Sequence, residues 1–495
     1  MNSSLARRSL ALLLLAPLGC GDDLPADPTE TSSGTTGAPG TGGSTTAAQE
    51  SSSSGDETGD PVDDEVPLDP EDLEWPQLDC DPLSPEYCAF PFPSNVYTSP
   101  SEVMATGLQV QLPTAPFSAD PNAEPWSWSD GFSPGSAIMA YLPGATPTGL
   151  PSHEDFDASL RDDSPTVLID ALTGERIAHF SELDYSANDP DRRAFMVRPA
   201  SRLPPGRRYI VALRDIMGQD GQPLAASPAF AALRDRTELP EEPSVEARRA
   251  LYGDIFYRLR QAGVPRQDLQ LAWDFTTATD DNTTGWLLHM RDDAFAALGP
   301  DGSPPYTIDV VDTEWFPEDF LYRLEGTFEV PMYLDSESPA VGRLLRDAVG
   351  MPVANGTLQV PFYMIVPRSA ETTPAALMQH GHGLLGQGNQ IESGHFREVA
   401  STYGYAIFGI DWIGMATEDY LPIAATVSAR GSTGLAVMTD RLHQGSLNQL
   451  LAMRLAWAGL AEDPLLTGLL DPDERYWYGI SQGGILGGVY MGTTT

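Results

Sequence analysis

One serine of the sequence stands in a setting that can make its hydroxyl a nucleophile. Residues 479–483 read Gly-Ile-Ser-Gln-Gly; they follow a short aromatic run at 476–478 and precede a glycine-rich apolar stretch at 484–490 that can start a helix. A strand, a sharp turn and a helix form the context of a nucleophile elbow, in which flanking glycines let a tight backbone carry the serine outward. We therefore predict that Ser481 is the nucleophile of an acyl-transfer reaction and that the backbone N–H of Gln482 stabilises the developing oxyanion.

The same five-residue pattern occurs a second time, at residues 131–135, where it reads Gly-Phe-Ser-Pro-Gly. Proline stands here at the position whose N–H would have to serve the oxyanion, and proline has no N–H to donate. The pattern at 131–135 therefore predicts a turn around Ser133 without a catalytic role.

A second motif, His380-Gly381-His382-Gly383, lies upstream of Ser481, directly after an apolar run at 375–379. Glycines let a backbone approach a substrate closely, and a loop after a strand supplies further oxyanion donors in hydrolases with a nucleophile elbow. On these two motifs the chain from about residue 322 to its end resembles the α/β-hydrolase superfamily of serine esterases and lipases. The resemblance implies that the N–H groups of His382 and Gln482 form the oxyanion hole, with that of Gly383 as a further candidate donor.

The sequence lacks the residues that metal sites and several cofactors require. His380 and His382 could instead bind a metal ion, but no carboxylate or cysteine lies at a fitting spacing. The sequence contains no lysine, which excludes a phosphate-loop lysine and Schiff-base chemistry. We therefore predict no metal site and no cofactor.

The base and the acid that acyl transfer by serine requires are not found in their usual order. In this fold an acid and then a histidine follow the serine along the chain. None of the seven histidines and no acidic residue lies beyond Ser481, so we expect a C-terminally truncated part of a longer enzyme. Upstream, Asp411 ends a predicted strand, and Asp440 and His443 share one face of a predicted helix. We interpret Asp440 and His443 as a solvated helix face or a local hydrogen-bonded pair.

The elements around these motifs alternate between strands and helices. Such alternation calls for a largely parallel sheet with crossover helices. The fold class predicted for residues 322–495 is therefore an α/β-hydrolase-like fold with an incomplete parallel sheet. Strands are expected at 326–333, 357–366, 375–379, 405–411 and 476–480, and helices at 391–403 and 434–461.

Residues 76–300 show a different pattern, with short apolar or alternating runs cut by Pro, Gly and Asp. They predict a mostly β, sandwich-like domain with a helical appendage. Asp220-Gly221 predicts a hairpin turn in preference to a calcium-binding loop. Helices are expected at 244–262, with Ser244 as N-cap, and at 281–298. The expected strands are 108–112, 137–142, 166–170, 194–198, 208–213 and 269–275.

Short matches within this domain also resemble a known family. They are Phe-Pro-Phe-Pro-Ser at 90–94, Asp-Gly-Phe-Ser at 130–133 and the stretch 198–211. Together they resemble the N-terminal module of bacterial virulence-factor-type lipases over about residues 80–279. That resemblance implies an exported, often surface-anchored esterase.

The first twenty residues predict export. Two arginines precede an apolar run at 10–18 that is too short to span a membrane and ends at Gly19-Cys20. This arrangement resembles a bacterial lipoprotein signal, which implies removal of residues 1–19 and lipidation of Cys20. The protein would then be anchored to the cell envelope, most simply at the outer membrane; secretion without a lipid is the alternative.

A linker and a disulfide are expected next. Residues 20–75 are rich in Ser, Thr, Gly, Pro and acidic residues, and this composition predicts a disordered linker. Cys80 and Cys88 are the two cysteines left once Cys20 is set aside, and in an exported protein they predict one local disulfide.

The net charge of the chain indicates which kinds of molecule it can bind. Asp and Glu total 70 against 28 Lys and Arg, which gives a formal net charge of −42. A field of that sign repels polyanions, so we expect no nucleic-acid partner. We expect an exported serine hydrolase of carboxylic esters with lipid-like or short acyl groups, and a membrane contact through Cys20. The alternative is a non-catalytic surface lipoprotein whose hydrolase-like half is inactive.

Overall fold

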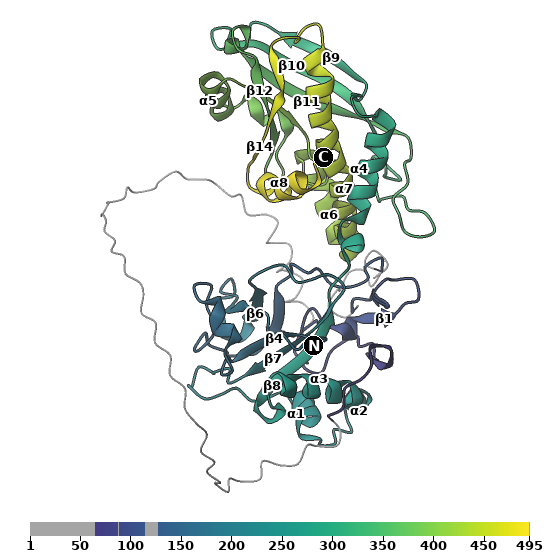
Figure 1. Ribbon diagram of the computed structural model, residues 1–495, viewed down its shortest axis with the longest axis vertical. Helices are drawn as coiled ribbons and strands as arrows, with labels where there is room; N and C mark the ends of the chain where they lie inside the picture. Colours follow the sequence, from purple (N-terminus) through teal and green to yellow (C-terminus); the bar gives the residue numbers. More distant parts are fainter. Residues whose placement is uncertain (1–64, 88, 114–126, 495) are drawn as a thin grey trace, which may run out of the picture. The chain divides into compact units, whose positions relative to one another are not determined.

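The computed structural model describes residues 65–87, 89–113 and 127–494 (Figure 1). The predicted signal and lipidation site at Cys20, and Cys88 of the predicted disulfide, lie outside these residues. Cys80 is disulfide-bonded. Within the described residues, no helix combines the length and the apolar character needed to cross a bilayer.

Two three-stranded antiparallel sheets form the framework of the β-rich part. One has the order β3-β6-β5 and the other the order β4-β7-β8. All eight residues of β8 are buried, including the polar residues Gln270, Asp274 and Thr276. The strands, with the short pair β1 and β2, are β1 Thr98–Pro100, β2 Leu108–Val110, β3 Ile138–Tyr141, β4 Thr166–Asp170, β5 His179–Leu183, β6 Ala194–Pro199, β7 Arg208–Arg214 and β8 Leu269–Thr276.

Helices α1 Pro228–Asp235 and α3 Arg249–Gln261 pack against the sheet of β7 and β8, and α2 Pro243–Ala247 contacts both of these helices. The single helix predicted at 244–262 is therefore two helices that meet at Arg248. The prediction of Ser244 as N-cap is wrong, because Glu242 is the N-cap and accepts a hydrogen bond from the Ser244 N–H. Pro243 explains the difference, since its fixed φ and missing N–H suit the first helical position, which makes the preceding residue the cap.

Residues 65–75, the last part of the predicted linker, belong to the described structure. Glu65 is only 8% exposed, and its carboxylate lies 3.0 Å from the guanidinium of Arg260. The N–H of Leu68 donates to Asp254 at 2.9 Å. The stretch 65–75 carries Leu68, Leu73 and Trp75 and so has apolar area to bury, unlike the Ser/Thr/Gly-rich chain before it. The final part of the predicted linker is therefore part of the β-rich unit.

A six-stranded sheet with the order β14-β12-β13-β11-β10-β9 forms the C-terminal part (Figure 1). β12 runs parallel to β13 and β14, whereas the other pairings are antiparallel. The expected largely parallel sheet is thus a mixed sheet, because β9, β10 and β11 are joined by direct antiparallel connections. The strands are β9 Tyr306–Asp312, β10 Phe320–Pro331, β11 Thr357–Pro367, β12 Ala375–Gly381, β13 Tyr405–Ile410 and β14 Leu470–Gly479.

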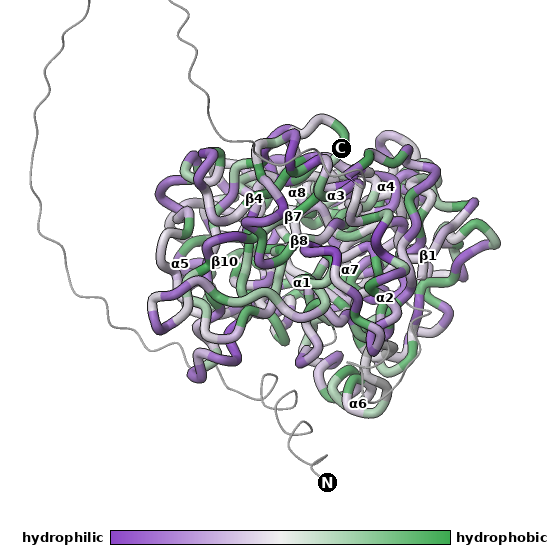
Figure 2. Tube along the Cα trace, turned by 90° about the horizontal axis from the view of Figure 1, so that it is seen from below, coloured by the Kyte–Doolittle hydropathy of each residue, from purple (hydrophilic) through white to green (hydrophobic). Residues whose placement is uncertain are grey.

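Helices cover both faces of this sheet. Neighbouring residues of β11 show the alternation, since Met364 belongs to the core that α7 Ser432–Ala458 completes and Ile365 belongs to the core of α5 Gly394–Tyr403. Helix α8 Gln482–Thr493 follows β14 directly. Helix α6 Tyr420–Arg430, which the sequence analysis missed, is a largely hydrophobic segment of the trace in Figure 2, and its Leu421 is 73% exposed.

The observed boundary between the two domains also differs from the predicted one. Helix α4 Asp280–Leu298 was expected within the β-rich domain at 76–300, but its Met290 and Ala294 are buried in the core of the six-stranded sheet. Strand β9 likewise precedes the predicted start at 322. The C-terminal unit therefore begins near Asp280, because the apolar residues of α4 pack against α7.

Candidate active site

Ser481 occupies a strained turn between a strand and a helix. β14 ends at Gly479, and α8 begins at Gln482 with Ser481 as its N-cap residue. Ser481 has φ 52° and ψ −120°, a backbone conformation that costs a non-glycine residue about 1–3 kcal/mol. Its side chain is exposed. The structure thus has the strand, sharp turn and helix that the sequence predicted around Ser481.

The glycines of the turn are required by close packing. A Cβ atom on Gly479 would lie 2.4 Å from the carbonyl oxygen of Gly483. A Cβ atom on Gly483 would lie 2.1 Å from the carbonyl oxygen of Gly381. Larger residues at these positions would push the turn away from the end of β12.

The loop after β12 lies directly against this turn. The N–H of Ile480 donates to the carbonyl oxygen of Gly381 at 3.0 Å. A Cβ atom on Gly383 would lie 3.3 Å from the Cβ and 4.0 Å from the Oγ of Ser481. The structure therefore brings the two sequence motifs together, and it places Gly383 beside the serine.

Unused backbone donors surround the serine. Within the described part of the chain, the N–H groups of His382, Gly383 and Gln482 donate to no protein acceptor. Gln482 is the first residue of α8, where the helix leaves its N–H groups free and places a partial positive charge. This arrangement can hold an anionic oxygen next to the Ser481 hydroxyl.

The side chain of His382 fixes the loop, a role that sequence reasoning missed. Its Nε2 accepts a hydrogen bond of 2.8 Å from the N–H of Trp412, so the proton of the neutral ring is on Nδ1, which donates to the carbonyl oxygen of Gly383 at 2.8 Å. Burial lowers the pKa of His382 and keeps the ring neutral. No local signal in the sequence could have revealed this role, because Trp412 lies in another loop.

His380 is also engaged by protein groups. Its Nδ1 lies 3.1 Å from the carbonyl oxygen of Tyr478, and its Nε2 lies 3.1 Å from the side-chain amide oxygen of Gln390. Burial lowers the pKa of His380. Within the described residues, no group of three or more His, Cys, Asp or Glu side chains could hold a metal ion.

The upstream acid and base candidates have other partners. Asp440 is buried and lies 2.6 Å from Arg343 and 2.9 Å from Arg346, while His443 contacts the carbonyl oxygen of Thr439 at 2.9 Å. The interpretation of Asp440 and His443 as a solvated face or a local pair is therefore wrong, because two arginines from a neighbouring loop draw Asp440 inward.

Asp411 has a structural contact as well. Its Oδ1 accepts a hydrogen bond of 2.6 Å from the N–H of Gly388. In the described part of the chain, no histidine or carboxylate hydrogen-bonds to the Ser481 hydroxyl. Among the described residues, the features found around Ser481 are therefore the strained turn and the free backbone N–H groups.

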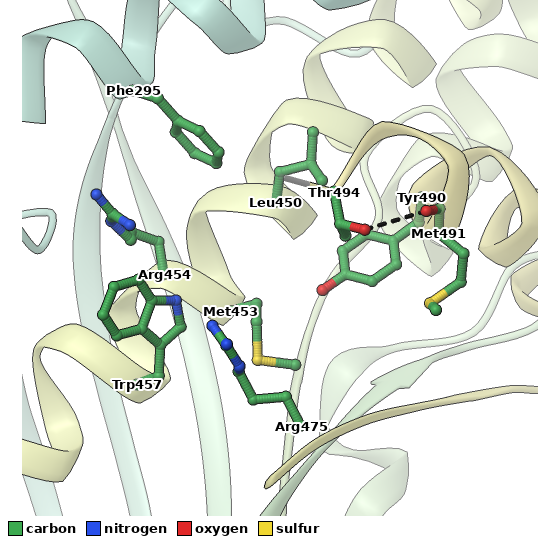
Figure 3. Close-up of a pocket in the computed structure, with 9 residues that line it drawn as sticks. All are labelled: Phe295, Leu450, Met453, Arg454, Trp457, Arg475, Tyr490, Met491 and Thr494. Carbon is green, nitrogen blue, oxygen red and sulfur yellow. Dashed lines mark hydrogen bonds between the residues drawn. The ribbon is translucent and has the colours of Figure 1, made fainter. Parts of the chain in front are cut away.

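The second serine pattern forms a turn, as predicted. The N–H of Ser136 donates to the carbonyl oxygen of Ser133 at 3.2 Å, and the N–H of Gly135 donates to the Ser133 Oγ at 3.3 Å. A cavity of about 240 Å³ lies elsewhere in the C-terminal unit, between α7, β14 and α8 (Figure 3). Ser481 is not among its lining residues, which include Phe295, Trp457, Arg475 and Tyr490.

Comparisons with known proteins show only distant similarity to solved structures. No protein-family model and no curated protein matches the chain. A solved structure from Bacteroides fragilis, assigned as an acetyl xylan esterase, aligns over 43% of this chain and 51% of its own at 14% identity, with a TM-score of 0.25. The chain thus spans about half the length of that protein, and a likeness at this level carries no conclusion about fold or activity.

Proposed function

We propose that this protein is a serine hydrolase of carboxylic esters that forms an acyl-enzyme at Ser481. The observation that carries the proposal is the position of Gly383, whose Cβ would lie 3.3 Å from that of Ser481, at a residue with φ 52° between a strand and a helix. A strained serine of this kind, facing an oxyanion loop after another strand, is the arrangement of a nucleophile elbow. The family resemblance and the predicted envelope anchor favour lipid-like or short acyl esters.

The proposed reaction uses the serine and the backbone donors together with a general base. The Ser481 oxygen attacks the ester carbonyl carbon as a general base takes the hydroxyl proton, and the carbonyl electron pair moves onto oxygen. The N–H groups of Gly383, Gln482 and His382 stabilise that oxyanion. The alcohol leaves with a proton, and water then cleaves the acyl-serine bond and restores the hydroxyl.

A fluorophosphonate probe tests this proposal. The protein, expressed from its complete coding sequence, is expected to be labelled at Ser481, as identified by mass spectrometry of the modified peptide. Ser481→Ala should lose the label. Ser133→Ala is the matched control, because Ser133 carries the same pattern in a turn, and it should keep the label.

A second candidate function is a non-catalytic surface lipoprotein that binds a partner. The observation that favours it is the lack of a histidine or carboxylate bonded to the Ser481 hydroxyl among the described residues. Absence of labelling in a folded protein, with no hydrolysis of short acyl esters, would support this candidate and exclude the hydrolase.

We also propose that the protein is exported and anchored through a lipid on Cys20. The support is the apolar run that ends at Gly19-Cys20. Growth with an alkyne-bearing fatty acid should label the wild-type protein and leave Cys20→Ala unlabelled. Equal labelling of both proteins would place the lipid elsewhere.

A further inference from the structure

A cavity of about 570 Å³ lies in the β-rich unit, and its lining residues include none of those of the proposed hydrolase site. Its walls are the segment 70–75, the turn at 106–108 and the ends of β4, β7 and β8. Cavities of 300–1,000 Å³ with a few placed polar groups are typical of small-molecule sites. The volume of this cavity is therefore large enough for one or two sugar-sized rings.

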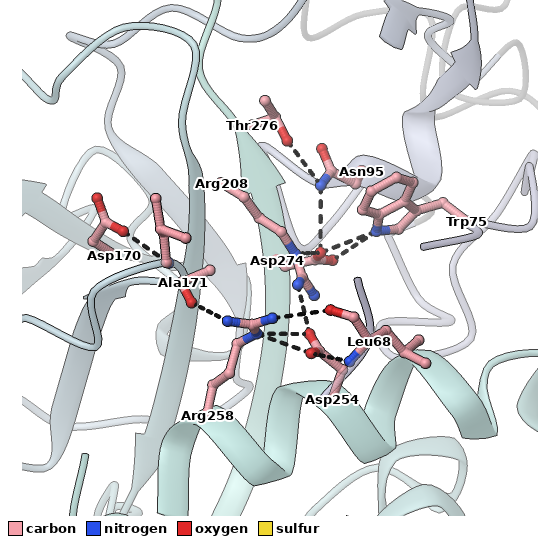
Figure 4. A network of polar contacts seen from close by, with 11 residues as sticks. Leu68, Trp75, Asn95, Asp170, Ala171, Arg208, Asp254, Arg258, Asp274 and Thr276 are labelled. Atoms are coloured by element: carbon pink, nitrogen blue, oxygen red, sulfur yellow. Dashed lines mark hydrogen bonds and ion pairs between the residues drawn. The ribbon is translucent and has the colours of Figure 1, made fainter. Parts of the chain in front are cut away.

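A network of ion pairs holds two of these walls in place (Figure 4). Asp254 accepts hydrogen bonds from Arg208 at 2.5 Å, from Arg258 at 2.9 Å and from the Leu68 N–H at 2.9 Å. Arg258 also donates to the carbonyl oxygen of Ala171 at 2.5 Å. The segment before the cavity and the loop after β4 are thus tied to the same helix, α3, and the cavity is pre-organised.

Trp75 forms a fixed apolar wall. Its indole N–H donates to Asp274 at 3.0 Å, and Asp274 is held in turn by Arg208 at 2.6 Å. Leu172 lines the same cavity and is 77% exposed. An aromatic ring that cannot turn away presents a flat face on which the C–H surface of a ring-shaped ligand can stack.

Unused donors and acceptors lie on the same walls. One terminal nitrogen of Arg207 donates a hydrogen bond to Asp170 at 2.8 Å. Its Nε and its second terminal nitrogen have no acceptor among the described residues, and its side chain is 43% exposed. Glu71 and Glu74 are exposed and have no hydrogen bond or ion pair within the described residues. A hydroxyl group both donates and accepts, so free carboxylates beside a free guanidinium suit a ligand rich in hydroxyls.

The charges favour a neutral ligand over an ionised one. Asp254 and Asp274 offset Arg208 and Arg258, and Asp170 offsets Arg207. Glu71 and Glu74 remain uncompensated and repel an anion. A cation would meet the free edge of Arg207 and a Trp75 ring that already has the Arg208 guanidinium 5.9 Å from its centroid.

We propose that this cavity binds a neutral carbohydrate, with one pyranose ring on Trp75 and its hydroxyls on Arg207, Glu71 and Glu74. The assignment does not depend on Ser481. It gives the β-rich unit a recognition role of its own.

Calorimetric titration of the full chain with neutral tetrasaccharides (cellotetraose, maltotetraose and mannotetraose) tests the proposal. At least one should bind saturably, whereas tetragalacturonate and the glucosamine tetramer, its anionic and cationic counterparts, should bind at least tenfold more weakly. Trp75→Ala should weaken the neutral sugar at least tenfold. Arg207→Gln should weaken it severalfold, and this variant leaves the network around Asp254 intact.

Two controls separate this site from the others. Tyr185→Ala removes an aromatic ring that is 59% exposed and does not line the cavity, so the affinity should stay unchanged. Ser481→Ala should bind the sugar normally even if hydrolysis is lost. The proposal is overturned if no neutral tetrasaccharide binds, if a charged one binds as tightly, or if Trp75→Ala and Arg207→Gln both keep the wild-type affinity.

Discussion

The surroundings of Ser481 and those of the cavity beside Trp75 are organised by different means. Around Ser481 the polar groups are backbone N–H donors, and their positions depend on glycines that allow two segments to touch. Around the cavity the groups are charged side chains, which hold one another through buried ion pairs. The first arrangement suits a charge that appears during a reaction, whereas the second suits a ligand with many hydroxyls. Mutations should therefore act through sterics and strain at the serine, and through charge at the cavity.

Removing Asp254 should have the largest effect on stability. Its carboxylate is fully buried and partners Arg208 and Arg258, so Asp254→Ala leaves each of these two guanidinium groups without one of its acceptors. We expect a loss of about 3–5 kcal/mol in the free energy of unfolding, measured by urea denaturation. Asp235→Ala, which removes a 47% exposed partner of Arg234, should cost less than about 1 kcal/mol. Equal losses of stability in Asp254→Ala and Asp235→Ala would contradict the statement that buried ion pairs hold the walls of the cavity.

A pH titration should show the next largest effect. His179 lies in the β-rich unit between the Thr166 hydroxyl at 2.9 Å and the Ile177 carbonyl at 2.8 Å, and burial lowers its pKa to about 4. In the unfolded chain this histidine binds its proton with the ordinary pKa of 6.5, so its contribution to stability is present above pH 6.5 and is lost as the pH falls toward 4. The loss is on the order of 3 kcal/mol.

His179→Gln removes this titration, and its unfolding free energy should fall less steeply between pH 6.5 and 4. His153→Gln changes an exposed histidine and serves as the control. Parallel curves for wild type and His179→Gln would show that the buried ring does not titrate in this range.

Steric substitutions test the turn around Ser481. Gly483→Ala places a Cβ 2.1 Å from the Gly381 oxygen and should destabilise the protein by about 1–3 kcal/mol and abolish probe labelling. Gly488→Ala lies in the same helix with nothing within 4 Å, so it should be neutral or stabilising by up to about 1 kcal/mol. If Gly483→Ala is tolerated, the two motifs do not touch as described.

Backbone strain at the serine should give the smallest effect. Ser481→Gly and Ser481→Ala both remove the nucleophile, but only glycine adopts φ 52° without strain. We expect Ser481→Gly to be about 1 kcal/mol more stable than Ser481→Ala in thermal unfolding. Equal stabilities would show that the turn is unstrained.

Apolar runs of neighbouring residues predicted the buried strands well. The apolar runs of β4, β7, β8 and β12 were found within a few residues of their observed bounds, because each is buried along most of its length. β9 was missed, since most of its residues are exposed. Helix α6 was missed because Pro422, near its start, weakened the helical signal.

Partners distant in sequence could not be predicted. The bond from Trp412 to His382 and the arginines around Asp440 depend on loops that meet only after folding. The turn at Ser481 was predictable because its strand, glycines and helix are contiguous. The cavity beside Trp75 was not, since its walls come from segments as far apart as residues 70 and 276.

The attachment of Glu65 and Leu68 has a mechanical consequence. Glu65 lies 3.0 Å from Arg260 and 3.7 Å from Arg266, and Leu68 is bonded to Asp254 and Arg258. Tension arriving along the upstream chain is shared by these contacts and passes into α3. Segment 70–75, which forms one wall of the cavity, carries no force as long as the contacts of Glu65 and Leu68 hold. A protein pulled from its N-terminus should therefore keep the shape of its cavity up to a threshold force.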